Sequence, residues 1–285
     1  MDTAAPTAAT AAYDIPALKA AYDADGFVKV PGLVSQAWVE RLTAVIHEFL
    51  KRDPGDPYST YFGHGPGRTT IRWMWREMDE VQRFARESGV APVIAGIIGS
   101  RSAFLWYDNT FIHEGGHEGE HQAGTPWHHD VVAFPFKGAQ NPSVWIALTP
   151  IDGDNAPLAC LRGSHRTGAL YRPVVYTDQN APVADGFSAP PDWQALIEAG
   201  EWEPVWYPMA PGDVLMIHPN TIHGAPPVKA GAPTRIGMST RWGGDDLRWW
   251  PHPYALDFPG VDYARVTPGT RPEGPLFPVA WRAGD

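Results

Sequence analysis

The chain has 285 residues, of which 44% are hydrophobic and 19% are charged, so it can bury a sizeable core and wholesale disorder is excluded. Its 22 Lys and Arg residues stand against 32 Asp and Glu residues, which gives a formal net charge of −10. An acidic chain has no long-range attraction for phosphate backbones or anionic lipid, so we expect neither a nucleic-acid nor a membrane partner.

The single cysteine, Cys160, excludes an internal disulfide and any cysteine-based zinc site, which favours a cytoplasmic location. The first residues carry an acid where a signal peptide needs bases, so residues 1–14 are expected to form a frayed tail. We expect one domain over 15–285. Its predicted parts are a helical cover mainly over 15–98, a β-barrel over about 103–245 and a covering segment over 246–285.

The first third of the chain shows mainly helical signals. Apolar residues recur at helical spacing after Ser35, which is a good N-cap, and glycines mark the ends of other segments. The expected elements are, in order, a helix over 16–23 ended by Gly26, a strand over 27–33, a helix over 37–52, a loop over 53–68, a tryptophan-bearing stretch over 71–75, and helical segments between 79 and 98 split at Gly89 and Pro92.

From Ala103 onward the hydrophobic period changes to two, which indicates strands. The composition agrees, because 30 Pro and 29 Gly suit many short strands joined by ordered loops. We therefore predict a mostly β fold with flanking helices, arranged as a sandwich or jelly-roll barrel. The expected strands lie within 103–114, 143–151, 157–163, 213–219 and 235–242.

The densest polar cluster is TPWHHDVVAFPF, which contains His128 and Asp130. On a strand these two side chains would point to the same face, whereas His129 would point away. Downstream, GDVLMIHPNTIHG offers His218 and His223. Two imidazoles and one carboxylate on one face of a metal are typical of non-heme Fe(II) oxygenases. Without the later motif, an ordinary surface pair of His128 and Asp130 would be the simpler interpretation.

The motifs WHHDVVAFPF, DNAPLACLRGSH and GDVLMIHPNTIHG, followed by an arginine, resemble the phytanoyl-CoA dioxygenase-like branch of the Fe(II)/2-oxoglutarate oxygenases. The opening DADGFVKVPGLVS is also similar to that branch, so the resemblance runs from about residue 20 to about 245. It implies a double-stranded β-helix, the cupin-like jelly roll, with Fe(II) as cofactor and 2-oxoglutarate and O2 as cosubstrates. Separately, the surplus of aromatic residues suggests a partly apolar organic substrate of small to medium size, such as a secondary metabolite or an acyl compound.

The resemblance assigns His128, Asp130 and His223 as the catalytic metal ligands, because the distal ligand of the family precedes a glycine. It assigns Arg235 to the far carboxylate of 2-oxoglutarate, where a planar guanidinium can pair in a bidentate fashion, and Trp145 to a place beside the cosubstrate. His218 is the alternative distal ligand. Arg241 is the alternative anchor, since it lies six residues from Arg235 and both would share one face of a strand.

Four further residues are candidates for the substrate pocket, namely Asn109, His113, Phe134 and Phe136. Asn109 alternates in step with His113, and the two phenylalanines follow the metal strand, where they could wall the site or pack in the core. The loop HEGGHEGEH over 113–121 could be a solvated loop, an active-site lid or a second metal site.

The chain also departs from the family pattern. Ala225 stands where relatives often have Ser, Asn155–Ala156 replaces Asn-Gly, and His113 replaces a Lys. These differences affect secondary contacts to the cosubstrate and leave the ligand set complete. Asp130 is retained, whereas halogenating relatives have Gly or Ala there, so hydroxylation or a related C–H oxidation is favoured, with release of succinate and CO2.

Two other functions share part of this pattern. A cupin-type dioxygenase or isomerase would have the same ligands but no need of Arg235. A jelly-roll binding module could retain the ligands without catalysis. The residues specify neither the substrate, a CoA thioester included, nor the oligomeric state.

Overall fold

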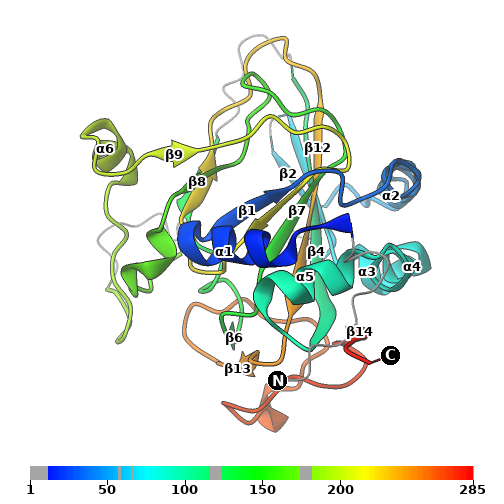
Figure 1. The fold of residues 1–285 in the computed structure, drawn as a ribbon, viewed down its shortest axis with the longest axis vertical. Coiled ribbons are helices and arrows are strands. Elements are labelled where there is room, and N and C mark those ends of the chain that lie inside the picture. Colours follow the sequence, from blue (N-terminus) through cyan, green and yellow to red (C-terminus); the bar gives the residue numbers. More distant parts are fainter. Residues whose placement is uncertain (1–11, 57–58, 66, 116–123, 174–181, 285) are drawn as a thin grey trace.

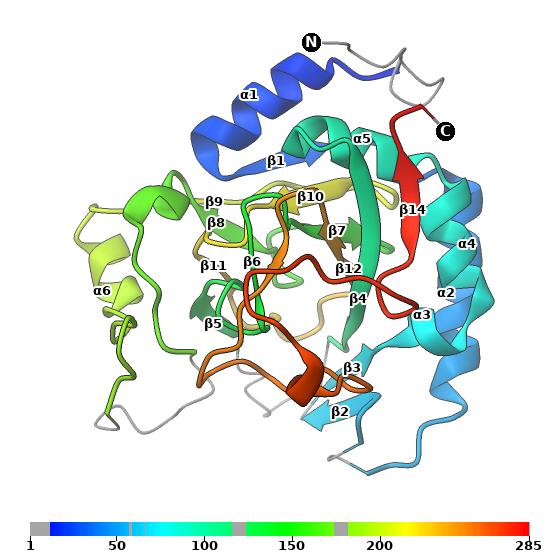
Figure 2. The same cartoon turned by 90° about the horizontal axis from the view of Figure 1, so that it is seen from below.

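A computed structural model describes residues 12–56, 59–65, 67–115, 124–173 and 182–284. Its centre is a pair of facing β-sheets (Figures 1 and 2). The major sheet has the strand order β1-β10-β7-β12-β4-β3-β2, with β14 also pairing with β4. The minor sheet has the order β5-β11-β8-β9, and every pairing in both sheets is antiparallel. This architecture confirms the predicted jelly-roll fold.

The major sheet consists of β1 (Phe27–Val30), β2 (Phe62–Gly65), β3 (Arg68–Arg72), β4 (Ser102–His113), β7 (Ser143–Ala147), β10 (Val214–Ile217), β12 (Arg235–Gly243) and β14 (Val279–Arg282). The minor sheet consists of β5 (Thr125–His128), β8 (Ala159–Leu161), β9 (Pro204–Val205) and β11 (His223–Ala225). A separate two-stranded antiparallel sheet consists of β6 (Phe136–Lys137) and β13 (Arg248–Trp249).

The helices are α1 (Ile15–Asp25), α2 (Gln36–Leu50), α3 (Met74–Glu77), α4 (Asp79–Glu87), α5 (Val90–Ile98) and α6 (Trp193–Glu198). All but α6 lie along the outer side of the major sheet (Figure 2). Local chemistry sets their ends as predicted: the Ser35 hydroxyl accepts a hydrogen bond from the Trp38 amide, and Gly26 ends α1 with φ of 85°. Gly89 divides α4 from α5, also with positive φ.

Side chains of the central strands alternate between two cores. In β7, Val144 and Ile146 face the helices, whereas Trp145 and Ala147 belong to an inner cluster with residues of β8 and β10. This alternation makes the helix-facing side of the major sheet apolar. Its inner side can therefore carry the polar residues of a site.

The structure corrects three expectations. The segment over 53–68, expected to be a loop, contains β2, and β3 follows it, so the N-terminal region contributes strands to the major sheet as well as helices. The strand that carries His128 ends at that residue, and Asp130 lies in the bend beyond it. The covering C-terminal segment contributes β14, which adds to β4 because that strand is long enough to pair with more than two neighbours. The predicted tail falls mostly outside the described residues.

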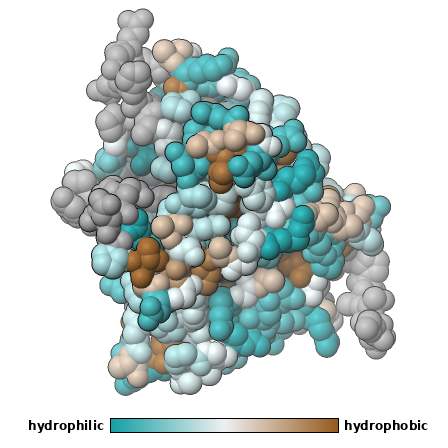
Figure 3. All heavy atoms as spheres, turned by 90° about the vertical axis from the view of Figure 1, so that its left-hand side faces the viewer, coloured by the Kyte–Doolittle hydropathy of each residue, from teal (hydrophilic) through white to brown (hydrophobic). Residues whose placement is uncertain are grey.

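The surface on the side of α6 and β9 is largely hydrophilic, with hydrophobic side chains in small separate areas (Figure 3). Among the described residues, Trp206 is a large aromatic side chain that is exposed, with an exposed fraction of 41%. None of the described helices combines the length and apolar character needed to cross a bilayer.

Candidate metal centre and cosubstrate site

Two of the predicted ligands are cross-strand neighbours in the minor sheet. His128 ends β5 and pairs directly with His223, the first residue of β11. Directly opposed residues point to the same side of a sheet, and the two imidazole rings lie with centroids 4.3 Å apart. The pairing of two strands from distant parts of the chain therefore brings both histidines to one point.

Backbone carbonyls orient both rings. His128 Nδ1 lies 2.7 Å from the Pro126 carbonyl oxygen, and His223 Nδ1 lies 2.9 Å from the Thr221 carbonyl oxygen. A carbonyl can only accept, so each Nδ1 carries a proton and each Nε2 is the ring nitrogen left to bind a metal. Burial, and secondarily His128, lower the pKa of His223 to about 4, so its imidazole is neutral at physiological pH.

The carboxylate of Asp130 completes the group. Its Oδ1 lies 3.8 Å from His128 Nε2, and its Oδ2 lies 3.6 Å from His223 Nε2. The three ligand atoms all lie within 4.8 Å of one another. Both separations from Asp130 are shorter than twice a metal–ligand bond length of about 2.1 Å, so each histidine can share one ion with this carboxylate.

Two side chains of the major sheet hold this carboxylate. Arg241 Nη2 lies 2.9 Å from Asp130 Oδ1, and the Ser143 hydroxyl donates to Oδ2 over 2.6 Å. Burial alone would raise the pKa of Asp130, but Arg241, both histidines and Ser143 together hold it well below the usual range. Asp130 is therefore an anion, and the donor set of two imidazoles and one carboxylate suits Fe(II) with positions left open.

Sequence reasoning did not identify Ser143 or assign Arg241 to this contact. A weak signal exists for Ser143, because it precedes Trp145 by two residues and must share its inward face. Arg241 has the same parity on its strand as Arg235, so alternation along the strand does not distinguish the two. Its contact with Asp130 in the structure shows what it binds.

Arg235, at the start of β12, is 3% exposed and has no acidic partner among the described residues. Its Nη1 donates to the Ala156 carbonyl, and its Nε is buried without a hydrogen-bond partner in the described chain. Burial, and secondarily Arg68, lower its pKa to about 10, so it remains a cation. A buried guanidinium without a counter-ion needs an anionic ligand, and the far carboxylate of 2-oxoglutarate fits this requirement. Arg241 does not, because it is already paired.

The surroundings of Arg235 include two other predicted residues. Its guanidinium lies 5.7 Å from the centre of the Trp145 ring and 3.4 Å from both ring nitrogens of His113, its register partner on β4. Burial, then Arg235, lower the pKa of His113 to about 3, so it does not supply the positive charge of the lysine found in relatives. Ala156 adopts φ of 58°, the left-handed conformation that glycine takes more readily.

The remaining candidates separate into two groups. Asn109 is 8% exposed on the inward face of β4, and Phe134, also 8% exposed, packs on Tyr107 with centroids 4.9 Å apart. Phe136 is completely buried among aromatic side chains, including Phe258, so core packing is the role that the structure shows. A residue without exposed surface cannot line a substrate pocket.

The other histidines of the two motifs lie away from this group. His129 accepts a hydrogen bond from the Tyr171 amide over 3.1 Å. It therefore points away from the metal ligands, as expected, although it lies just beyond the end of β5. His218 packs against His165, with ring centroids 5.1 Å apart, and is not within the ligand cluster. Most of the His/Glu-rich loop over 113–121 lies outside the described residues.

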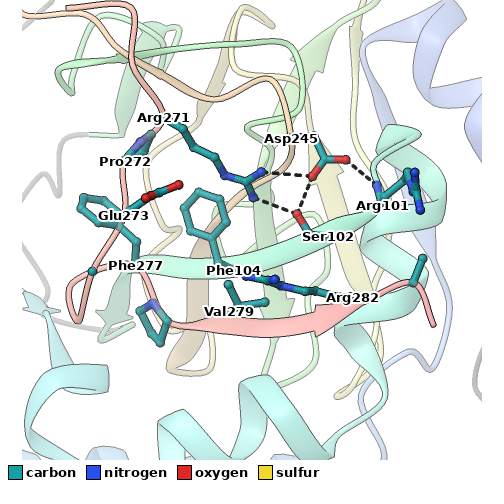
Figure 4. Close-up of a pocket in the computed structure, with 13 residues that line it drawn as sticks. Arg101, Ser102, Phe104, Asp245, Arg271, Pro272, Glu273, Phe277, Val279 and Arg282 are labelled. Atoms are coloured by element: carbon teal, nitrogen blue, oxygen red, sulfur yellow. Dashed lines mark hydrogen bonds and ion pairs between the residues drawn. The ribbon is translucent and has the colours of Figure 1, made fainter. Parts of the chain in front are cut away.

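A cavity beside the C-terminal segment contains none of the predicted ligands (Figure 4). Arg271 pairs with Asp245 over 3.4 Å and donates to the Ser102 hydroxyl over 2.9 Å, while Asp245 accepts from the Arg101 amide. These groups satisfy one another and connect the C-terminal segment to the start of β4. The cavity thus marks a structural junction rather than a reactive centre.

The fold is similar to that of several solved enzymes. The epimerase SnoN from nogalamycin biosynthesis, solved with Fe3+, alpha ketoglutarate and nogalamycin RO, matches at 20% identity and TM-score 0.73, covering 94% of this chain and 98% of its own. The carbocyclase SnoK matches at 18% and 0.71, covering 97% and 100%. EctD from S. alaskensis, solved with 2-oxoglutarate and 5-hydroxyectoine, matches at 18% and 0.66, covering 97% and 88%. No curated protein sequence matches the chain.

The sequence model of the phytanoyl-CoA dioxygenase (PhyH) family matches residues 22–237, which is most of the chain. This match confirms the predicted class, that of non-heme iron enzymes dependent on 2-oxoglutarate, and with it the predicted Fe(II) and cosubstrate. From the family match and the motifs together, the chain belongs to the phytanoyl-CoA dioxygenase family.

Proposed function

We propose that this enzyme hydroxylates, or otherwise oxidises at a C–H bond, a small-to-medium organic molecule, with conversion of 2-oxoglutarate and O2 to succinate and CO2. The observation that carries the proposal is the joint presence of the His128, Asp130 and His223 cluster and a buried Arg235 without a counter-ion. Fe(II), when bound, supplies the activation of O2 and the oxidising power that side chains lack.

In this proposal each residue has a separate task. His128, Asp130 and His223 hold the metal from one side, and Arg241 with Ser143 fixes the ligand carboxylate. Arg235 binds the far carboxylate of 2-oxoglutarate, with Trp145 beside it. Apart from Asp130, these side chains come from both sheets, so the site depends on how the two sheets face each other.

The substrate belongs to secondary metabolism in this proposal. Two proteins of similar fold, SnoN and SnoK, are named for nogalamycin biosynthesis, and EctD was solved with 5-hydroxyectoine. The retained Asp130 favours C–H oxidation over halogenation. We also propose a cytosolic location, which the single, buried Cys160 supports because it needs no oxidising compartment.

The test is anaerobic reconstitution with Fe(II), followed by titration with 2-oxoglutarate. We expect one iron per chain and a visible charge-transfer band that saturates with 2-oxoglutarate. Arg235→Leu should weaken 2-oxoglutarate binding by about 10-fold or more, because a charge-assisted hydrogen bond contributes about 1.5–3 kcal/mol. Arg248→Leu, in β13 and outside the ligand cluster, is the matched control.

The outcomes separate the alternatives. Stoichiometric iron without a 2-oxoglutarate band would favour a cupin-type enzyme that does not use this cosubstrate. A chain that binds no iron after reconstitution would be a binding module. Screening metabolites for succinate formation, together with a mass gain of one oxygen in the product, then identifies the substrate.

A further inference from the structure

A third arginine on the inner face of the major sheet has no role in the site described above. Arg72, at the end of β3, pairs in register with Asn109 of β4, and Asn109 pairs in turn with Ser239 of β12. Ser239 accepts a hydrogen bond from Arg241 Nη1 over 3.0 Å, and Arg241 contacts Asp130. Opposed residues share one face of a sheet, so Arg72 lies on the same face as the metal ligand's partners.

The guanidinium of Arg72 has an unused binding capacity. Its one hydrogen bond with the described residues is to the Phe62 carbonyl oxygen over 3.3 Å, and it forms no ion pair with them. Gly63 leaves room for it, because a Cβ there would lie 2.7 Å from Arg72 Nη2. An arginine seated in this way presents most of its five donors to a ligand.

Neighbouring polar groups are also unsatisfied. Asn109 is buried, with an exposed fraction of 8%, and its Oδ1 has no hydrogen-bond partner among the described residues. The same is true of Arg241 Nε. Buried polar atoms are normally paired, so Arg241 Nε lacks an acceptor and Asn109 Oδ1 lacks a donor beside the metal cluster. A ligand carboxylate can supply the missing acceptor. Asn109 would meet such a carboxylate through its Nδ2, which donates.

Tyr107 connects these groups. It stands opposite Arg241 in the register, two residues before Asn109, and is 5% exposed. The strand register places Tyr107, Asn109 and Arg72 on one face of the sheet. Burial raises the pKa of the Tyr107 hydroxyl, while Arg72 and Arg241 both act to lower that pKa. Arg72, Tyr107 and Asn109 thus offer a guanidinium, a hydroxyl and an amide to one ligand.

The wall next to these donors is apolar. The Trp73 ring packs on Tyr107 with centroids 4.4 Å apart, and Phe134 also packs on Tyr107, with centroids 4.9 Å apart. Trp73 adopts φ of 63°, which is rare for a large residue and concentrated at functional sites. The buried carboxylate of Asp108 holds this turn by accepting from the amides of Met74 and Trp75.

We propose that Arg72, Tyr107 and Asn109 form a pocket that binds the carboxylate of the substrate, with the apolar body of the substrate against Trp73 and Phe134. The planar fork of an arginine matches a carboxylate in a bidentate fashion. This inference rests on the proposed function and names the substrate class as an organic acid with an aromatic or aliphatic body. The substrate carboxylate and the far carboxylate of 2-oxoglutarate thus have different binding residues, Arg72 for the first and Arg235 for the second.

The experiment uses the full chain loaded with Fe(II) and saturating 2-oxoglutarate, without oxygen. The probes are three matched pairs of acid and amide: phenylacetate and phenylacetamide, 3-phenylpropionate and 3-phenylpropionamide, octanoate and octanamide. Binding is followed by calorimetry and by the change in the charge-transfer band. Saturation with 2-oxoglutarate prevents the acids from occupying the Arg235 site.

We expect at least one acid to bind about 10-fold or more tightly than its amide, because the carboxylate forms a charge-assisted hydrogen bond with the guanidinium and the neutral amide does not. Arg72→Gln should abolish this preference, and Arg72→Lys should keep part of it, because lysine retains the charge without the planar fork. Arg83→Gln removes one exposed arginine of α4 and should leave the preference unchanged. The band and the melting temperature of each variant show that it is folded and loaded.

The results distinguish this inference from the proposed function. If the wild-type enzyme shows the 2-oxoglutarate band but no acid binds better than its amide, the carboxylate pocket is refuted while the proposed function stands. A preference that persists in Arg72→Gln also refutes the pocket. Absence of the band in the wild-type enzyme contradicts the proposed function itself.

Discussion

At the scale of single residues, hydrogen bonds decide which atoms are available for binding. The carbonyl partners of His128 and His223 fix the proton on Nδ1, so both Nε2 atoms face Asp130. Arg241 and Ser143 occupy one lone pair on each oxygen of that carboxylate. The ligand set is therefore oriented by its neighbours before any ion binds.

A residue outside the site provides a test of buried histidine chemistry. His218 accepts a hydrogen bond from the Asn220 amide, and burial, then His165, lower the pKa of His218 to about 4. The unfolded state, with a histidine pKa of about 6.5, binds more protons between these values. The metal-free protein should therefore lose stability as pH falls from about 6.5 towards 4, and keep it above that range.

His218→Gln should reduce this acid sensitivity, because glutamine is polar and of similar size but does not titrate. The measurement is the melting temperature of the metal-free protein at pH 7 and pH 5. His47→Gln, at an exposed position of α2, serves as the control and should behave as the wild type. An equal loss on acidification in His218→Gln and wild type would contradict the assignment.

At the scale of elements, β12 shows how one strand serves both parts of the site. Arg235, Gly237, Ser239 and Arg241 alternate onto its inner face, and its register partners on β4 and β7 set what each one meets. Gly237 is required there, because a Cβ would lie 2.1 Å from Cζ2 of Trp145. The glycine thus lets the indole lie flat over the strand next to Arg235.

Gly237→Ala should therefore displace Trp145 and weaken 2-oxoglutarate binding. We expect a loss of about 1–3 kcal/mol in the free energy of unfolding from overpacking, together with a higher dissociation constant for 2-oxoglutarate in the band titration. The matched control is Gly65→Ala at the end of β2, where an added Cβ meets no atom within 4 Å. Unchanged stability and 2-oxoglutarate affinity in Gly237→Ala would show that the indole position is unimportant.

At the scale of the whole molecule, the C-terminal segment completes the barrel. The family match ends at residue 237, yet Phe258 and Phe277 beyond it join Trp106 and Phe136 in one aromatic core. This segment crosses beneath the barrel and returns as β14 beside β4 (Figures 1 and 2). The core behind the proposed substrate pocket therefore depends on residues outside the family match.

Phe258→Ala should lower the free energy of unfolding by about 3–5 kcal/mol, since the ring is 1% exposed and contacts Trp73 and Phe136. Urea denaturation measures this loss. Leu256→Ala, in the same segment but 54% exposed, should change it by less than about 0.5 kcal/mol. Similar values for the two variants would mean that the segment does not contribute to the core.

The order and spacing of motifs were sufficient to predict the fold class, the family and the cofactor. Alternation of period two and helical spacing are local properties, and α2, β4, β7 and β12 lie close to their expected positions. The ligand types also follow from local sequence, because His128, Asp130 and His223 each lie in a motif with its own neighbours. Composition excluded a disulfide framework in the same direct way.

Contacts between distant segments were decided only by the tertiary structure. Parity along β12 left Arg235 and Arg241 equivalent, and only the resemblance to the family favoured Arg235. The ion pair with Asp130 shows what Arg241 binds instead. The segment expected as a loop holds β2, since its pairing with β3 depends on a partner rather than on local pattern. Arg72 lies beside Asn109 through the pairing of β3 with β4, which likewise depends on a distant partner. Sequence determines which groups are present, whereas strand register determines which of them meet, because register is set by the whole barrel.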